Sequence, residues 1–255
     1  MFKELIKYKD ILMEFIIRDI KIKYRRSYLG VLWSLLNPLF TMLVMTAIFS
    51  TLFKSSIKNF PVYLLSGQIM IIYFSEATNQ AMNSIISNAP LIRKIYIPKY
   101  LFCLSKILSS GVTLLSSFIA MLIVAFFTGI KFNVAILGSI FPMLYLMIFA
   151  LGIGYILATL AVFFRDITHL YNVFLLIWSY LTPTFYPVEI LPNTVRTFVN
   201  FNPLAIYAFM MRDSVLYGKF SHLSSHGLGL SIALITFAIG YSLFKKSENK
   251  FILYI

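Results

Sequence analysis

The chain has 255 residues, of which 60% are hydrophobic and only 12% are charged. About a quarter of the residues of a soluble domain are charged, so this composition excludes an ordinary soluble protein and favours a protein of the lipid bilayer. The formal net charge of +13 is explained better by anionic lipid headgroups than by nucleic acid, because most of the basic residues lie in loops and flanks of apolar segments. We expect membrane lipids, and no nucleic acid, as partners.

The first 26 residues carry charges throughout and have no apolar core, so they do not resemble a cleavable signal peptide. Between residues 8 and 28, apolar side chains such as Ile11, Phe15 and Ile20 recur roughly at helical spacing, with charged side chains at other positions. This pattern predicts an amphipathic helix over 8–28 that lies on the inner face of the membrane, although an ordinary cytoplasmic lead-in fits the same residues.

Long uncharged intervals follow this helix. A helix needs about 20 apolar residues to cross a hydrocarbon core of about 30 Å. Four intervals of 22 to 27 uncharged residues each fit one crossing, a fifth separates Lys131 from Arg165, and a sixth contains Glu76 as its only charge. The predicted fold is all-α, one membrane domain over 1–255. Its six transmembrane helices are predicted at about 31–53, 61–84, 103–127, 134–163, 168–187 and 227–244.

The distribution of Lys and Arg predicts the orientation. Six crossings place both termini on one side, and 16 of the 22 basic residues then lie on that side. Since cytoplasmic loops carry the excess of Lys and Arg, both termini are predicted to be cytoplasmic. The basic residues left for the outer side are Lys54, Lys58, Lys131, Arg196, Arg212 and Lys219.

Two connecting segments have unusual composition. Residues 86–100 combine two prolines with three basic residues, which predicts a sizeable cytoplasmic loop with a short helix. Residues 187–220 are too apolar for a plain exposed loop, and Asn202 and Pro203 divide them into stretches too short to span the membrane. We expect short helices on the outer face there.

Sequence signatures of catalysis are absent. No G-x-x-x-x-G-K-[ST] run exists to bind nucleotide phosphates, so any ATP that drives this protein is bound by another chain. The lone Cys103 excludes an intrachain disulfide, and no H-E-x-x-H motif is present. His222 and His226 are four residues apart, but two histidines make a poor metal site without further ligands. We therefore expect no enzyme activity, cofactor or metal on this chain.

A polar stripe is predicted within the second span. Glu76, Asn79, Gln80 and Asn83 stand at i, i+3, i+4 and i+7, so they share one face of a helix. Such a stripe either lines a hydrated path or joins helices by hydrogen bonds, and the sequence leaves both open.

Aromatic residues are numerous, with 25 Phe, 16 Tyr and 2 Trp. Interfacial belts and close packing use aromatic residues in every membrane protein, so their presence alone assigns no role. The aromatic residues that we name as candidates for lining a path are Trp33, Phe40, Tyr171, Phe174, Trp178 and Tyr180.

Four segments together resemble the membrane subunit of type-two ABC exporters for O-antigen, capsular polysaccharide or teichoic acid. They are KYRRSYLGVLWSLLNPLF (23–40), PLIRKIYIPK (90–99), FFRDITHLYNVFLLIWSYLTPTFYPVEILP (163–192) and FNPLAIY (201–207). Each pattern is loose by itself, but they occur in the family's order over nearly the whole chain.

The resemblance implies a homodimer with two nucleotide-binding ATPase subunits that use ATP and Mg, in the plasma membrane of a bacterium. A lipid-linked polysaccharide would enter from the inner leaflet and pass between the two copies, where aromatic faces suit a sliding sugar chain. The residues implied to couple to the ATPase are Pro90, Arg93, Lys94 and Pro98, to which we add the charged pair Arg165 and Asp166. Those implied to form an outer gate are Phe185, Tyr186, Phe198 and Phe201.

Three other functions fit the sequence less well. An ABC exporter of a small drug or lipid has the same number of spans, but this function does not account for the four segments. An ion-coupled secondary transporter usually places carboxylates or broken helices near the midplane, often in repeated halves. A membrane-bound transferase needs a concentrated set of acids, histidines or metal ligands, and nine scattered acidic residues do not supply one.

Overall fold

The computed structural model describes residues 6–25, 27–53, 57 and 59–255, and every regular element in them is helical. The α-helices are α2 (Lys9–Tyr24), α3 (Leu32–Phe53), α4 (Phe60–Ser87), α5 (Ala89–Lys94), α6 (Tyr100–Phe127), α7 (Ile140–Phe163), α8 (Ile167–Leu181), α9 (Asn193–Phe201), α10 (Pro203–Val215) and α11 (Leu223–Ser247). Three short 3₁₀ helices are η1 (Val134–Ser139), η2 (Val188–Ile190) and η3 (Glu248–Leu253).

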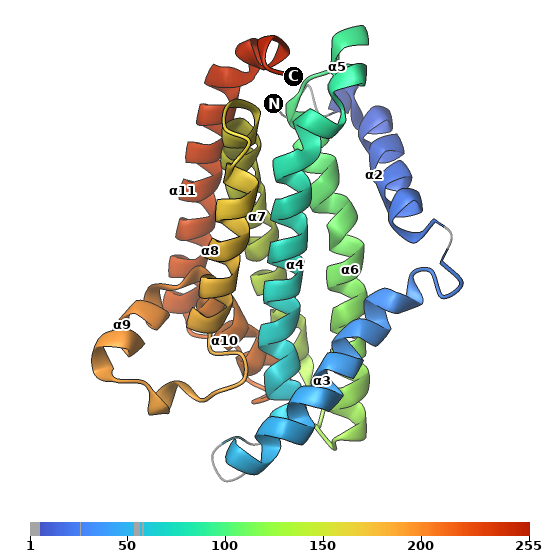
Figure 1. Cartoon of the computed structure of the whole chain (residues 1–255). Helices are drawn as coiled ribbons and strands as arrows, with labels where there is room; N and C mark the ends of the chain where they lie inside the picture. The colour runs from blue at the N-terminus through green and yellow to red at the C-terminus, as the bar shows by residue number, and fades with distance from the viewer. Residues whose placement is uncertain (1–5, 26, 54–56, 58) are drawn as a thin grey trace.

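The long helices α4, α6, α7 and α11 form a bundle with α4 near its middle (Figure 1). Helix α3 crosses α4 and α6 obliquely at one edge, and α8 lies over α4 and α7 (Figure 1). The beginning of α2, α5 and η3 lie at one end of the molecule, whereas α9 and α10 lie in the opposite half (Figure 1). The bundle therefore has two distinct ends.

Four segments are long and apolar enough to cross a membrane: Leu32–Phe49, Tyr100–Phe127, Val134–Phe163 and Leu223–Leu253. These segments identify a multi-pass membrane protein. Helix α4 has 28 residues but contains the polar stripe, and α8 is apolar but has only 15 residues. The count of six crossings therefore stays a prediction.

Helix α8 ends at Leu181, six residues before the predicted end of the fifth span. The reason is Pro183, because a proline disfavours the helical conformation of the residue before it. Thr182 accordingly has an extended backbone, with ψ at 122°. The chain then continues through η2 and α9 instead of completing a longer helix.

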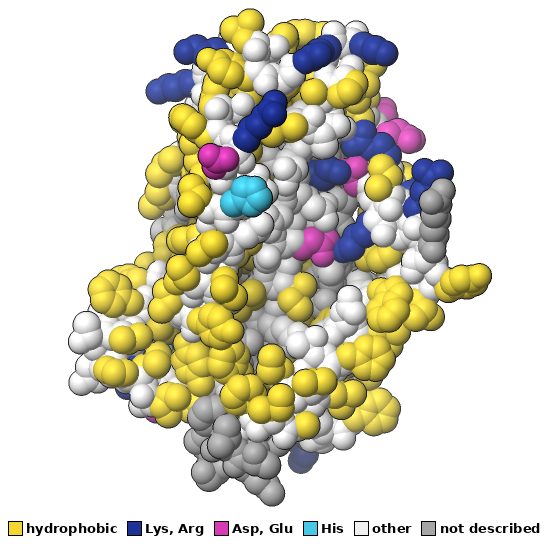
Figure 2. Space-filling model, viewed as in Figure 1, with side chains coloured by type: hydrophobic (Ala, Val, Ile, Leu, Met, Phe, Trp, Pro, Cys, Tyr) yellow, Lys and Arg dark blue, Asp and Glu magenta, His cyan; other side chains and the backbone are white. Residues whose placement is uncertain are grey.

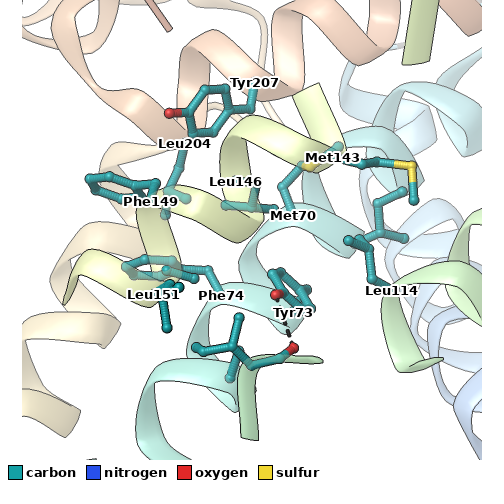
Figure 3. Packing of buried hydrophobic residues seen from close by; sticks show 14 of the residues in the cluster. Met70, Tyr73, Phe74, Leu114, Met143, Leu146, Phe149, Leu151, Leu204 and Tyr207 are labelled. Carbon is teal, nitrogen blue, oxygen red and sulfur yellow. Dashed lines mark hydrogen bonds between the residues drawn. The ribbon is translucent and has the colours of Figure 1, made fainter. Parts of the chain in front are cut away.

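Apolar side chains of α4 fill the centre of the bundle (Figure 3). Met70 and Phe74 are fully buried, and the Phe74 ring stacks on Phe149 of α7 with centroids 5.4 Å apart. The Tyr73 hydroxyl donates to the backbone oxygen of Ile107 on α6. Tyr207 of α10 joins the same cluster, so α4 binds the bundle and the outer helices into one core.

Helices α7 and α11 meet backbone to backbone at two glycines. A Cβ on Gly152 would lie 2.6 Å from backbone atoms of Thr236 and Phe237, and a Cβ on Gly240 would meet the backbone of Gly152. Small residues let membrane helices approach this closely and gain dispersion contacts. The pair Gly152 and Gly240 therefore sets the spacing of these two helices.

We predict that Gly240→Val destabilises the protein by about 1–3 kcal/mol, the usual cost of overpacking. Thermal unfolding of the detergent-purified protein, followed by size-exclusion chromatography, measures the loss. Gly227→Ala is the matched control on α11, because no atom lies within 4 Å of the added Cβ. Equal unfolding midpoints for Gly240→Val and Gly227→Ala would contradict this account of the packing.

Candidate functional site

Helix α2 runs alongside α6 in the same direction. The Phe15 ring stacks on Phe102 with centroids 5.0 Å apart, and the Lys23 Nζ donates to the Thr113 hydroxyl at 2.6 Å. A helix rises about 1.5 Å per residue, so the eleven positions from Phe102 to Thr113 correspond to about 16 Å along α6. The predicted position of α2 in the membrane interface stays a prediction, but its alignment with α6 is a feature that the sequence pattern did not indicate.

A buried carboxylate holds α2 against α6. The Asp19 side chain is only 3% exposed and pairs with Arg18 and Lys106, each at 3.0 Å. The Ser105 hydroxyl also donates to Asp19 at 3.3 Å. Burying a charge is costly unless it is paired and hydrogen-bonded, and this carboxylate is both.

A second ion pair joins α2 to α4. Lys23 Nζ lies 2.5 Å from Glu76 Oε1, and the Gln80 amide donates to the same oxygen at 2.9 Å. One member of the predicted polar stripe, Glu76, therefore joins two helices, and Gln80 supports it from one turn away on α4. The other two, Asn79 and Asn83, donate to backbone oxygens of α4.

The same stripe also borders open space. A cavity of about 450 Å³ lies between α2, α4 and α6 at this level. Its lining residues are Asp19, Ile22, Lys23, Asn79, Gln80, Asn83, Ser87 and Lys106. A contact between helices and the lining of an open space thus coexist on one face of α4, with Glu76 in the first role and Asn79, Gln80 and Asn83 in the second.

The aromatic path candidates fall into two groups. Trp33, Phe40, Phe174 and Tyr180 have exposed fractions between 41% and 60%, so they lie on the surface of α3 and α8. Tyr171 is only 5% exposed, and its hydroxyl donates to Thr78 at 2.7 Å. Tyr171 therefore packs inside the chain and does not line an open path within one copy.

Trp178 connects α8 with the outer helices. Its indole nitrogen donates to the Asn202 side-chain oxygen at 2.8 Å, and its ring contacts Phe74 and Phe149 edge-on. The same Asn202 oxygen accepts from the Leu204 amide and begins α10. Trp178 is half-buried and fixes the turn between α9 and α10 to the bundle.

The outer gate candidates are placed on both sides of η2. Phe185 and Tyr186 are half-buried, and the Tyr63 hydroxyl of α4 donates to the Tyr186 backbone oxygen at 2.9 Å. Phe198 and Phe201 on α9 are 73% and 66% exposed. Helix α9 therefore presents apolar rings outward, whereas Phe185 and Tyr186 are held close to α4.

A buried cation fixes α10 to α4. Arg212 is 2% exposed, donates to Ser66 at 3.0 Å and to the Pro183 carbonyl at 2.6 Å, and lies over the Tyr63 ring with its Cζ 3.5 Å from the centroid. Burial lowers the pKa of this guanidinium from its ordinary value, but arginine stays protonated in proteins. No carboxylate forms an ion pair with it among the described residues.

The coupling candidates lie at the end of the molecule where α5 and η3 meet (Figure 1). Pro90, Arg93 and Lys94 are exposed on α5, and Pro98 is half-buried. The Arg93 guanidinium donates to the Ile255 backbone oxygen. Arg165 and Asp166 are exposed in the link between α7 and α8.

Sequence reasoning selected Glu76 but not its partner Lys23, and it did not select Asp19 or Lys106. Nothing in a single sequence pairs residues 53 positions apart, as Lys23 and Glu76 are. Arg212 had a usable signal, because it is a lone cation inside the apolar run of α10. The distribution of basic residues predicts only that Arg212 lies on the outer side.

Metal ligands are scarce in the described part of the chain, where no three His, Cys, Asp or Glu side chains gather. His226 contacts Phe141 edge-on and shares a hydrogen bond with the Tyr145 hydroxyl at 3.3 Å. It therefore serves the packing of α7 against α11.

Helices long and apolar enough to span a bilayer, joined by ion pairs in one half and covered by short helices in the other, define a multi-pass helical membrane protein. The chain belongs to the ABC-2 type transporter family, whose model matches residues 12–216.

Curated relatives fall in the same family. An O-antigen export system permease protein RfbA of Klebsiella pneumoniae is 27% identical over 95% of this chain and 93% of its own length. One from Myxococcus xanthus is 30% identical over 73% of this chain and 72% of its own length. The polysialic acid transport protein KpsM of Escherichia coli is 22% identical over 91% and 92% of the two chains.

We predict that Asp19→Asn destabilises the protein by about 3 kcal/mol, because it leaves Lys106 and Arg18 without a carboxylate in a buried position. Unfolding of the purified protein in mixed micelles measures the change. Asp10→Asn is the matched control, since Asp10 is exposed on the same helix and is expected to change stability by less than about 0.5 kcal/mol. If both variants unfold like the wild type, the Asp19 cluster does not hold α2.

Proposed function

We propose that this chain is the membrane subunit of an ATP-driven exporter, which carries a lipid-linked polysaccharide from the cytoplasmic side across a bacterial plasma membrane. The single observation that carries this proposal is the match, over nearly the whole chain, to permease proteins named for O-antigen export. Relatives named for polysialic acid transport and capsule polysaccharide export point to the same class of cargo. These names favour a polysaccharide over a small drug or lipid.

The proposed topology has six crossings, by α3, α4, α6, α7 with η1, α8 and α11, and both termini in the cytoplasm. Support comes from the basic side chains that gather at the end where α5 and η3 lie (Figures 1 and 2). Apolar side chains cover the opposite half of the same face (Figure 2). That half suits the hydrocarbon core.

We propose that Glu76 lies near the inner boundary of this core, because α4 is longer than the hydrocarbon core is thick. The 28 residues of α4 extend about 42 Å, about 12 Å more than the hydrocarbon thickness. Lys23, which pairs with Glu76, precedes the first apolar span at Leu32 by only nine positions. The last turns of α4, with Asn79 and Asn83, would then project toward the cytoplasm and border the entry side of the path.

We propose that two copies assemble through α3 and α8. Only 17% of the apolar span on α3 is buried within one copy, against 67% for the span on α7. Large aromatic side chains such as Phe40, Phe174 and Tyr180 are exposed on these two helices. A second copy would cover these rings, and the polymer would slide along them between the copies.

The outer gate is proposed to comprise α9 and the segment after α8. Phe198 and Phe201 are exposed on α9, and Phe185 and Tyr186 stand between α8 and η2. Since Arg212 and Trp178 hold the base of this segment, movement would be confined to α9 and its exposed rings.

Energy is proposed to reach the chain through a separate ATPase subunit that binds ATP and Mg, two per dimer. Helix α5 presents Arg93 and Lys94 outward at the cytoplasmic end, with Arg165 and Asp166 exposed on a neighbouring link. Arg93 donates to the backbone oxygen of Ile255 and Lys99 donates to that of Glu248, and these hydrogen bonds stabilise this end. ATP binding in the partner would press on α5 and shift the balance between closed and conducting states.

We predict that a nucleotide-binding subunit with a P-loop co-purifies with this chain, one copy per copy, from native membranes in mild detergent. Mass spectrometry of the purified complex and its ATPase activity measure the partner and the ratio. A chain that comes out alone and still drives transport in an ion gradient would overturn the proposed function.

A further inference from the structure

A small cavity lies where the beginning of α4, η2 and the last turn of α10 meet. Its volume is about 290 Å³, at the small end of the usual range of ligand pockets, which is about 300–1,000 Å³. The side chains and backbone around it come from Ile57, Tyr63, Pro187, Val188, Glu189, Phe209, Arg212, Asp213 and Tyr217. None of the four aromatic gate candidates lines it, but η2 and Arg212 do, so the cavity lies at the base of the proposed gate segment.

One wall of this cavity carries a buried donor. Arg212 is 2% exposed, and its Nε and Nη2 atoms donate to Ser66, Tyr63 and Pro183. The remaining nitrogen, Nη1, is buried and has no hydrogen-bond partner among the described residues. Since the surrounding protein encloses this nitrogen, Arg212 gives the wall a positive charge rather than a hydrogen-bond donor that is open to the cavity.

The other polar walls carry acceptors. Glu189 is exposed on η2 and has no ion pair among the described residues, and Asp213 is half-buried and pairs only with Lys219 at 3.2 Å. Carboxylates accept hydrogen bonds and do not donate them at neutral pH. The cavity therefore has a buried positive charge behind one wall and acceptors on the other, without a direct ion pair between them.

This arrangement selects against simple ions. An anion attracted to Arg212 would meet two carboxylates, and a cation attracted to these carboxylates would meet Arg212. A neutral polyol avoids both repulsions, because each hydroxyl group donates and accepts. The rings of Tyr217 and Phe209 add apolar faces against which the C–H face of a sugar ring packs.

We propose that this cavity binds one neutral sugar ring, with Glu189 and Asp213 accepting from its hydroxyl groups and with the Tyr217 ring packing on its C–H face. The inference rests on the proposed function in one respect, since the sugar would be a unit of the exported polymer on the outer side. Tyr217 also lines a neighbouring cavity of about 810 Å³, together with Asn59, Lys131 and Asn133. Further units of a chain have room there.

The test is saturation-transfer NMR on the protein, purified with its ATPase and placed in lipid nanodiscs. The probes are the methyl glycosides of glucose, mannose, galactose and N-acetylglucosamine. We expect saturation transfer to at least one of them, and an apparent affinity about 10-fold weaker in Glu189→Gln and in Tyr217→Ala, since each removes one contact. Both side chains are exposed, so the variants are expected to fold.

Two controls keep the test sharp. Glu14→Gln removes an exposed carboxylate on α2 at the other end of the molecule, and Tyr96→Ala removes an exposed tyrosine after α5, so both should bind like the wild type. The inference is overturned if no glycoside gives a signal, if Glu189→Gln and Tyr217→Ala match the controls, or if excess inorganic phosphate abolishes the signal. Export of polymer without glycoside binding would overturn this inference alone, whereas binding without export would overturn the proposed function.

Discussion

The structure depends on how the polar groups of α4 are paired within an apolar bundle. A charge or amide facing hydrocarbon is costly, and α4 carries such groups at two separate levels. In the second half of α4, Glu76 pairs with Lys23 of α2. Near the beginning of α4, the hydroxyl of Ser66 and the backbone oxygen of Tyr63 accept from Arg212 of α10. The central helix α4 is therefore attached to α2 through Lys23 and to α10 through Arg212.

These two attachments divide the molecule into a fixed frame and parts that have room to move. The frame comprises α4, α6, α7 and α11, with α7 and α11 in backbone contact at Gly152 and Gly240. Helix α2 is joined to it by ion pairs, whose partners sit at the proposed inner boundary. Helix α9 has only one buried residue, Val199, and is the least attached of the outer helices. A push on α5 would thus reach α4 directly, because α5 follows α4 after a single residue.

Much of the fold was predictable from the sequence, because uncharged intervals and breaker residues are local signals. Each predicted span has a helix near it, and the short helices after Tyr186 were expected from the division at Asn202 and Pro203. The early end of α8 belongs with these local signals, because Pro183 disfavours a helical conformation of Thr182. Two features were not predictable. The pairing of Lys23 with Glu76 and the burial of Asp19 depend on how α2 aligns with α6, which no spacing rule specifies. The buried position of Tyr171 depends on the rotation of α8 about its axis, and no spacing rule specifies which neighbouring helix each face of α8 meets.

The measurement that tests the account most directly is the location of the polymer in cells that lack this chain. Cells of the source bacterium would be compared with and without the gene, and with the partner ATPase inactivated at its P-loop lysine. Surface polysaccharide and intracellular lipid-linked polysaccharide would be quantified in each. The account predicts that deleting the gene and inactivating the ATPase each remove the polymer from the surface and leave it inside the cell as a lipid-linked chain. Returning the gene to the deletion strain is expected to restore export. Normal surface polysaccharide without this chain would contradict it.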